Sequence, residues 1–151
     1  MTSERRDAYP LEALLQLREA ELGSAETAHR EALSHLETAR VACRQRAESL
    51  ACHDNQTRAL RLPTVVTAGE ALLHHVWQTR RRDEATHLRQ EVEEARAEER
   101  ASEQAALEAE RALRQALSEK QVVEKHRAQW AAAAARDAER RDEEHADDRR
   151  R

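Results

Sequence analysis

Apolar residues recur every three or four positions along the first third of the chain, with charged residues between them. This alternate spacing keeps a narrow stripe on one side of a helix and is typical of a coiled-coil seam. Pro10 suits the first helical position, where its missing amide proton costs nothing. The pattern predicts a long first helix over residues 10–61, with the stripe at Leu11, Leu15, Arg18, Leu22, Ala25, His29, Ala32, Leu36, Ala39, Cys43, Arg46 and Leu50.

The helical pattern is clearly interrupted once, between Leu62 and Gly69. Pro63 has no amide proton to give and pushes the residue before it out of helical conformation, so the first helix should end there. Thr67 and Glu70 have the spacing of a capping box, in which each side chain accepts a hydrogen bond from the other residue's backbone amide. We therefore expect a turn over residues 62–67 and a new helix from Ala68.

The second predicted helix covers residues 68–147 and contains no helix breaker. Residues 1–9 and 148–151 carry no periodic signal and are expected to be a flexible tail and a frayed end. The apolar stripe of the second helix includes Leu73, Val76, Leu88, Val92, Ala95, Ala106, Ala109, Leu113, Ala116, Val123 and Trp130.

Folding the chain at the break sets positions whose numbers add to roughly 128 or 129 opposite each other. Leucines of the first helix then meet apolar partners on the second, in the pairs Leu11 with Leu117, Leu15 with Leu113, Leu22 with Leu107 and Leu36 with Val92. The fold class predicted is all-α: an antiparallel two-helix coiled-coil hairpin with an off-centre turn and a longer second helix.

The same register leaves the second helix without an intramolecular partner from about residue 119. Val122, Val123 and Trp130 would then lie on a single helix in water. An isolated amphipathic helix is only marginally stable, so this arm is expected to dock onto something else.

Composition narrows the class further. Charged residues make up 37% of the chain and aromatic residues 2%, which leaves no material for a thick core. Disorder is the rival interpretation, but the net charge of −4 is small and opposite charges alternate, which favours order. Basic residues are spread among acidic ones rather than gathered on one stripe, which argues against a nucleic-acid partner.

No apolar run approaches the roughly 20 residues that a membrane span needs, and the first residues lack the apolar core of a signal peptide. We therefore expect a cytoplasmic protein. Cys43 and Cys52 are nine residues apart, on opposite faces of a helix, so they cannot bridge each other and fit a reducing compartment.

Two Glu-x-x-His pairs, Glu26 with His29 and Glu84 with His87, have the spacing found in di-iron bundles. With so many glutamates, one such pair is expected by chance, and a two-helix protein lacks the four-helix core that this site needs. No metal or cofactor is expected. The sequence also has no glycine-rich phosphate loop and no nucleophile with a matching base, which argues against an enzyme.

Two clusters are candidates for binding a partner. His74, Trp77 and Arg80, just after the turn, form a tip patch that is either a solvated helix face or a contact surface, since Trp and Arg are enriched at interface hot spots. Trp130 precedes the alanine run 131–135, which fits either coiled-coil packing in a homodimer or insertion into a channel of a partner.

Both ends of the chain resemble one family. The segment from Tyr9 to Glu21, leucine-rich and containing Arg-Glu, resembles the opening of the flagellar FliJ and type III secretion YscO proteins. The segments from Glu124 to Trp130 and from Arg136 to Glu144 are similar to the closing helix of that family, with its Glu-Arg-Arg-Glu pattern.

This resemblance implies a bacterial, non-enzymatic central stalk of a type III secretion system, peripheral to a membrane complex. Its partners would be a hexameric secretion ATPase at one end, and the cytoplasmic domain of the export gate or secretion chaperones at the tip patch. The implied ATPase-facing residues are Leu11, Leu14, Leu15, Arg18, Val123, His126, Arg127 and Trp130. The alternative is a generic homodimeric coiled-coil spacer or scaffold, in which four helices share the thin core.

Overall fold

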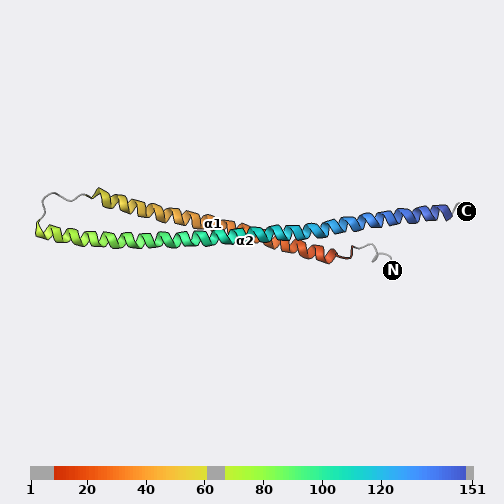
Figure 1. Cartoon of the computed structure of the whole chain (residues 1–151), viewed down its shortest axis with the longest axis horizontal. Helices are drawn as coiled ribbons and strands as arrows, with labels where there is room; N and C mark the ends of the chain where they lie inside the picture. Colours follow the sequence, from red (N-terminus) through yellow and green to blue (C-terminus); the bar gives the residue numbers. More distant parts are fainter. Residues whose placement is uncertain (1–8, 61–66, 149–151) are drawn as a thin grey trace. The chain divides into compact units, whose positions relative to one another are not determined.

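The computed structural model describes residues 9–60 and 67–148, and two helices contain nearly all of them. Helix α1 spans Glu12–Ala59 and helix α2 spans Ala68–Asp148 (Figure 1). No strand occurs in these two ranges. The helices pack against each other, which confirms the predicted all-α helical hairpin.

The start of α1 differs in detail from the prediction. Pro10 lies in a turn rather than in the helix, because the amide of Glu12 donates to the carbonyl of Tyr9 at 3.2 Å. Proline is favoured at the second position of such a turn, where its fixed backbone angle is already correct. The helix therefore begins two residues later than expected.

The start of α2 is the predicted capping box. The amide of Thr67 donates to the Glu70 carboxylate at 2.7 Å, and the amide of Glu70 donates to the Thr67 hydroxyl at 3.3 Å. The hydrogen bonds that the Thr67 amide and the Thr67 hydroxyl donate to the Glu70 carboxylate favour its charged form and lower the pKa of Glu70. The predicted turn around Pro63, the first eight residues and residues 149–151 lie outside the described residues.

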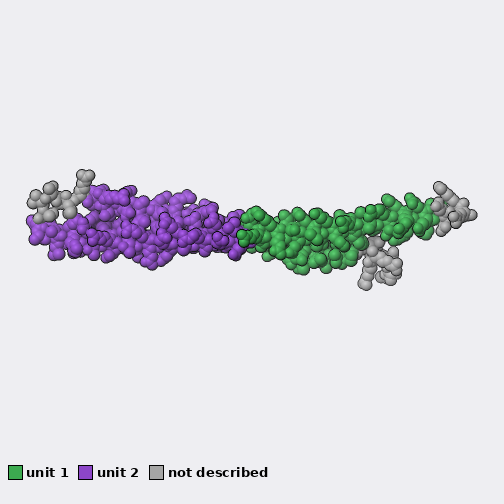
Figure 2. Space-filling view, in the orientation of Figure 1, with its two compact units in different colours: residues 1–29, 109–151 green, residues 30–108 purple. Residues whose placement is uncertain are grey.

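The chain divides into two compact units, coloured separately in Figure 2. Unit 1 comprises residues 1–29 and 109–151, and unit 2 comprises residues 30–108. In each unit a segment of α1 packs on a segment of α2.

In unit 1, the buried core is formed by Tyr9, Leu15 and Val123, with Leu14 and Trp130 packed against it. Three ion pairs across the two helices mark the register. Arg18 pairs with Glu119 at 2.5 Å, Arg127 with Glu12 at 3.4 Å, and Lys120 with Glu19 at 3.8 Å.

In unit 2, the apolar interior consists of small and medium side chains. The buried hydrophobic residues of this unit are Leu36, Ala39, Ala85, Val92, Ala95 and Ala106. Cross-helix contacts join His53 to Glu84 at 3.4 Å and Arg40 to Glu99 at 3.8 Å.

The predicted register was wrong. The numbers of paired residues add to 137 for Arg18 with Glu119 and to 139 for Glu12 with Arg127, instead of 128 or 129. In unit 2 they add to 137 for His53 with Glu84. In unit 1 the shift of about ten residues brings the start of α1 against residues 119–130 of α2. Val123 is therefore buried, although the prediction left it on an unpaired helix, while Val122 is exposed as expected.

The first turns of α2 also depart from the predicted stripe. Leu73 and Val76 were assigned to the seam, yet they are 72% and 58% exposed. Ala85, which is buried, was missed. In α1, the predicted seam position Arg46 is exposed and the neighbouring Ala47 is half-buried instead.

Candidate functional site

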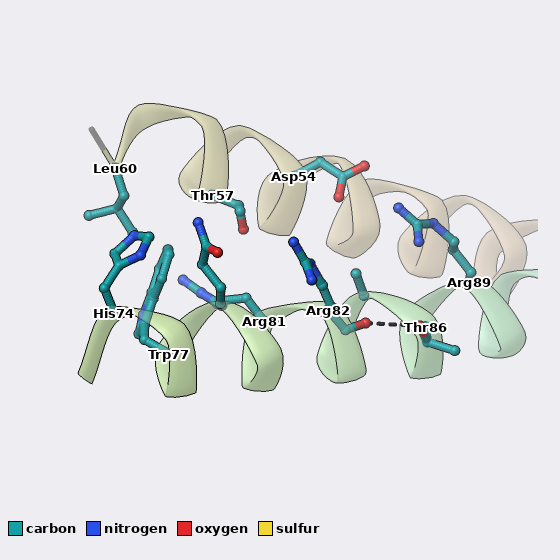
Figure 3. Close-up of a pocket in the computed structure, with 11 residues that line it drawn as sticks. Asp54, Thr57, Leu60, His74, Trp77, Arg81, Arg82, Thr86 and Arg89 are labelled. Carbon is teal, nitrogen blue, oxygen red and sulfur yellow. Dashed lines mark hydrogen bonds between the residues drawn. The ribbon is translucent and has the colours of Figure 1, made fainter. Parts of the chain in front are cut away.

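Unit 2 contains a groove of about 560 Å³ between the last turns of α1 and the first turns of α2 (Figure 3). This size is within the usual range for ligand pockets. Helix α1 contributes side chains at a spacing of three residues, and α2 contributes a row that follows one of its faces. The lining residues are Asp54, Thr57, Leu60, His74, Trp77, Gln78, Arg81, Arg82, Ala85, Thr86 and Arg89.

One end of the groove is aromatic and apolar. The rings of His74 and Trp77 lie 5.7 Å apart at an angle of 37°. Leu60, at the end of α1, lies beside them in Figure 3 and is 55% exposed. On the other side of Trp77, the guanidinium of Arg81 lies 5.6 Å from the indole centroid, within range of a cation–π interaction. The indole is thus held between an imidazole and a cation.

The arginines of the groove differ in their partners. Arg81 donates to the Glu84 carboxylate at 3.2 Å, and Arg80 donates to the other oxygen of that carboxylate at 3.1 Å. These two hydrogen bonds lower the pKa of Glu84. Arg82 and Arg89 form no ion pair with any of the described residues. Their charges are the ones that the groove can offer to a ligand.

A buried histidine, His53, directly precedes the groove residue Asp54 in α1. The His53 side chain is only 9% exposed, with Nε2 3.4 Å from Glu84 and Nδ1 3.8 Å from Asp54. Both contacts are too poor for a hydrogen bond, so neither ring nitrogen has a hydrogen-bond partner in the described ranges. His53 is the one buried polar residue among those described. It occupies a seam position that an apolar side chain would fill elsewhere.

The predicted tip patch coincides with this groove only in part. His74 and Trp77 line it, whereas Arg80 does not and its side chain is 81% exposed. The sequence interpretation missed Arg89 and the contribution of α1 through Thr57 and Leu60. The four-residue steps from Trp77 through Arg81 to Arg89 could have indicated one helical face. The α1 residues of the groove could be identified only with the correct register of the two helices.

Unit 1 carries the residues expected at the ATPase-facing end. Leu15 and Val123 belong to the buried core, and Leu14 and Trp130 pack against it. Leu11 is 38% exposed. Two of the charged members form cross-helix ion pairs, Arg18 with Glu119 and Arg127 with Glu12. The accessible members of this set are therefore Leu11, His126, Arg127 and part of Arg18.

Tyr9, which no prediction singled out as a site residue, closes this core. Its hydroxyl lies 2.8 Å from Nδ1 of His126 and 3.3 Å from the carbonyl of Val123. When Nδ1 carries the imidazole proton, it donates to the phenol oxygen while the phenol donates to the carbonyl. The phenol ring also meets the Trp130 ring edge-on at 5.7 Å.

Other candidate chemistry has little support in the described residues. No group of three or more His, Cys, Asp or Glu among them is arranged to hold a metal ion. Within the same ranges, neither helix contains a stretch apolar enough to cross a membrane. Cys43 and Cys52 are free thiols, and burial together with a hydrogen bond to Glu99 raises the pKa of Cys43.

Comparison with known proteins adds no assignment. No protein-family model, no curated protein and no solved structure matches this chain. The two surfaces described above and the resemblance noted in the sequence are therefore the basis for a function.

Proposed function

We propose that the chain is a non-enzymatic stalk of a bacterial type III secretion system, which engages a hexameric secretion ATPase from the cytoplasmic side. The observation that supports this proposal is the meeting of the two segments that carry the family resemblance. Tyr9 of the first segment contacts His126 and Trp130 of the second, although more than 110 residues separate them in sequence. Resemblance at both termini thus corresponds to one composite surface.

The physical character of unit 1 suits a ring-shaped partner. Charged pairs cross the helix interface, and acidic and basic residues alternate around it, so no single sign of charge dominates. A surface of this kind associates without being fixed to one subunit of a ring. The export gate or secretion chaperones are the proposed partners of the groove in unit 2.

The test is a purified cognate ATPase with the full chain added. We expect faster ATP hydrolysis and more hexamer. Val122, 64% exposed beside the buried Val123, is the residue to change. Val122→Asp should abolish the stimulation, while Leu33→Asp, at a 47% exposed leucine of unit 2, should leave it intact. The proposal would be contradicted if neither the wild-type chain nor the Leu33→Asp variant stimulated the ATPase.

A homodimeric spacer is the second candidate, and exposed leucines favour it. Leu17 and Leu117 in unit 1 are 52% and 44% exposed, as is expected of residues that a second copy would cover. Sedimentation equilibrium at several concentrations distinguishes the two functions. A tight dimer that becomes monomeric in a Leu17→Glu, Leu117→Glu variant would support the spacer.

A further inference from the structure

We propose that the groove of unit 2 binds an acidic peptide segment of a partner protein through an apolar anchor residue followed by two carboxylates. The charge of the groove favours an acidic ligand. Of the three arginines that line the groove, only Arg81 forms an ion pair with a described residue, whereas Asp54 is the sole carboxylate of the lining. The groove is locally basic on a chain whose net charge is −4.

The order of side chains along the groove favours an apolar anchor followed by carboxylates. Figure 3 shows Leu60, His74 and Trp77 together at one end, with Arg82 and Arg89 following in order along α2. An anchor side chain of the ligand would lie against Trp77 and Leu60. Its carboxylates would then meet the two arginines, which are planar donors suited to bidentate pairing with carboxylates.

Helix geometry gives the distances between the anchor and the two carboxylates of the ligand. Arg82 is five residues after Trp77 and Arg89 is twelve residues after it, so these arginines lie about 7 Å and 18 Å further along the axis. An extended peptide covers about 3.3 Å per residue. Because successive side chains of an extended peptide point to opposite faces, carboxylates on the anchor's face would stand about two and six residues after it.

A peptide is favoured over nucleic acid on the same observations. Two unpaired arginines beside Asp54 neutralise few phosphates, and the chain as a whole has 26 basic residues against 30 acidic ones. The apolar end has no counterpart in phosphate recognition. This inference depends on the groove alone and holds whether or not the chain is a secretion stalk.

The experiment titrates a peptide into the full chain and measures the heat of binding by isothermal titration calorimetry. The probe is an eight-residue peptide with one phenylalanine, aspartates two and six positions after it, and serine elsewhere. We expect saturable binding that weakens at least about tenfold in an Arg82→Glu, Arg89→Glu variant and on raising salt. Replacing either the phenylalanine or both aspartates of the peptide should weaken binding similarly.

The matched control is an Arg44→Glu, Arg100→Glu variant, which reverses two exposed arginines of unit 2 that lie outside the groove. Circular dichroism of both variants checks that the helices persist. The proposal is overturned if the control loses as much affinity as the groove variant, or if no binding occurs at about 1 mM peptide.

Two further outcomes would also overturn it. Tighter binding of a single-stranded oligonucleotide than of the peptide would make nucleic acid the ligand. Self-association of the chain that disappears in the groove variant would make a second copy the occupant.

Discussion

The hydroxyl of Tyr9 lies 2.8 Å from Nδ1 of His126, across 117 residues of sequence, and seals the core of unit 1. We expect Tyr9→Phe to cost about 1 kcal/mol, because it removes the hydrogen bonds and keeps the ring. Tyr9→Ala should cost up to about 3 kcal/mol, because the buried ring against Trp130 is lost as well. Thermal unfolding by circular dichroism measures both, and equal effects of the two changes would show that the ring contributes nothing.

Arg18 and Glu119 provide a test of the register. Arg18→Glu and Glu119→Arg should each lower the thermal midpoint, because each creates a pair of like charges across the helices. The double exchange should restore most of the loss, as a coupled pair does in a double-mutant cycle. The register expected from the sequence would instead set Arg18 near Glu110. Rescue of Arg18→Glu by Glu110→Arg, and not by Glu119→Arg, would therefore contradict the structure.

His53 is expected to be a destabilising residue. Its buried ring nitrogens lack hydrogen bonds to the described residues, so His53→Leu should raise the free energy of unfolding by about 1 to 2 kcal/mol. His87→Leu is the control, since the His87 side chain is 72% exposed and should change stability by less than about 0.5 kcal/mol. A loss of stability in His53→Leu would mean that the contact with Glu84 outweighs the cost of burial.

The stability of the chain should depend on pH through the Glu84 carboxylate. Hydrogen bonds from Arg81 and Arg80 lower its pKa in the folded state, so its ionised form stabilises unit 2. A lowered pKa contributes stability above the unfolded value of 4.5, and this contribution disappears as pH falls through the folded value. The stability difference between the wild-type chain and Glu84→Gln should therefore shrink as the pH falls below about 5.

Glu98→Gln is the control for this titration, because Glu98 is exposed and forms no ion pair with a described residue. Its difference from the wild-type chain should stay small across the same pH range. If Glu98→Gln reproduced the behaviour of Glu84→Gln, the effect would come from net charge rather than from the arginine contacts.

The apolar pattern was sufficient for the secondary structure and for most of the α1 seam. Leu15, Leu36 and Ala39 are buried as their spacing predicted, and Thr67 with Glu70 caps α2 as their residue types predicted. These features are local, because helical periodicity and capping depend on neighbours within a few residues.

The register could not be obtained from that pattern. A stripe with alternating steps of three and four residues meets an equivalent stripe again after a shift of ten, so Leu15 finds an apolar partner at either Leu113 or Val123. Where the seam consists of alanines, the packing energy differs little between the two registers. The charged pairs beside the seam distinguish the two, and Arg18 with Glu119 belongs to only one of them.

The groove was hidden for the same reason. His74 and Trp77 were recognised as a patch from composition, but Thr57 and Leu60 join them only in the observed register. A sequence interpretation that placed the helices ten residues out of step could not bring these α1 side chains beside Arg82 and Arg89.

The two tryptophans of the chain lie in different units, Trp130 against Tyr9 in unit 1 and Trp77 against Arg81 in unit 2. Each unit therefore contains its own intrinsic fluorophore. A Trp130→Phe chain reports emission from the groove alone, and a Trp77→Phe chain reports emission from the Tyr9 core alone. Unfolding of the two units can thus be followed separately by fluorescence, without attaching a dye to either helix.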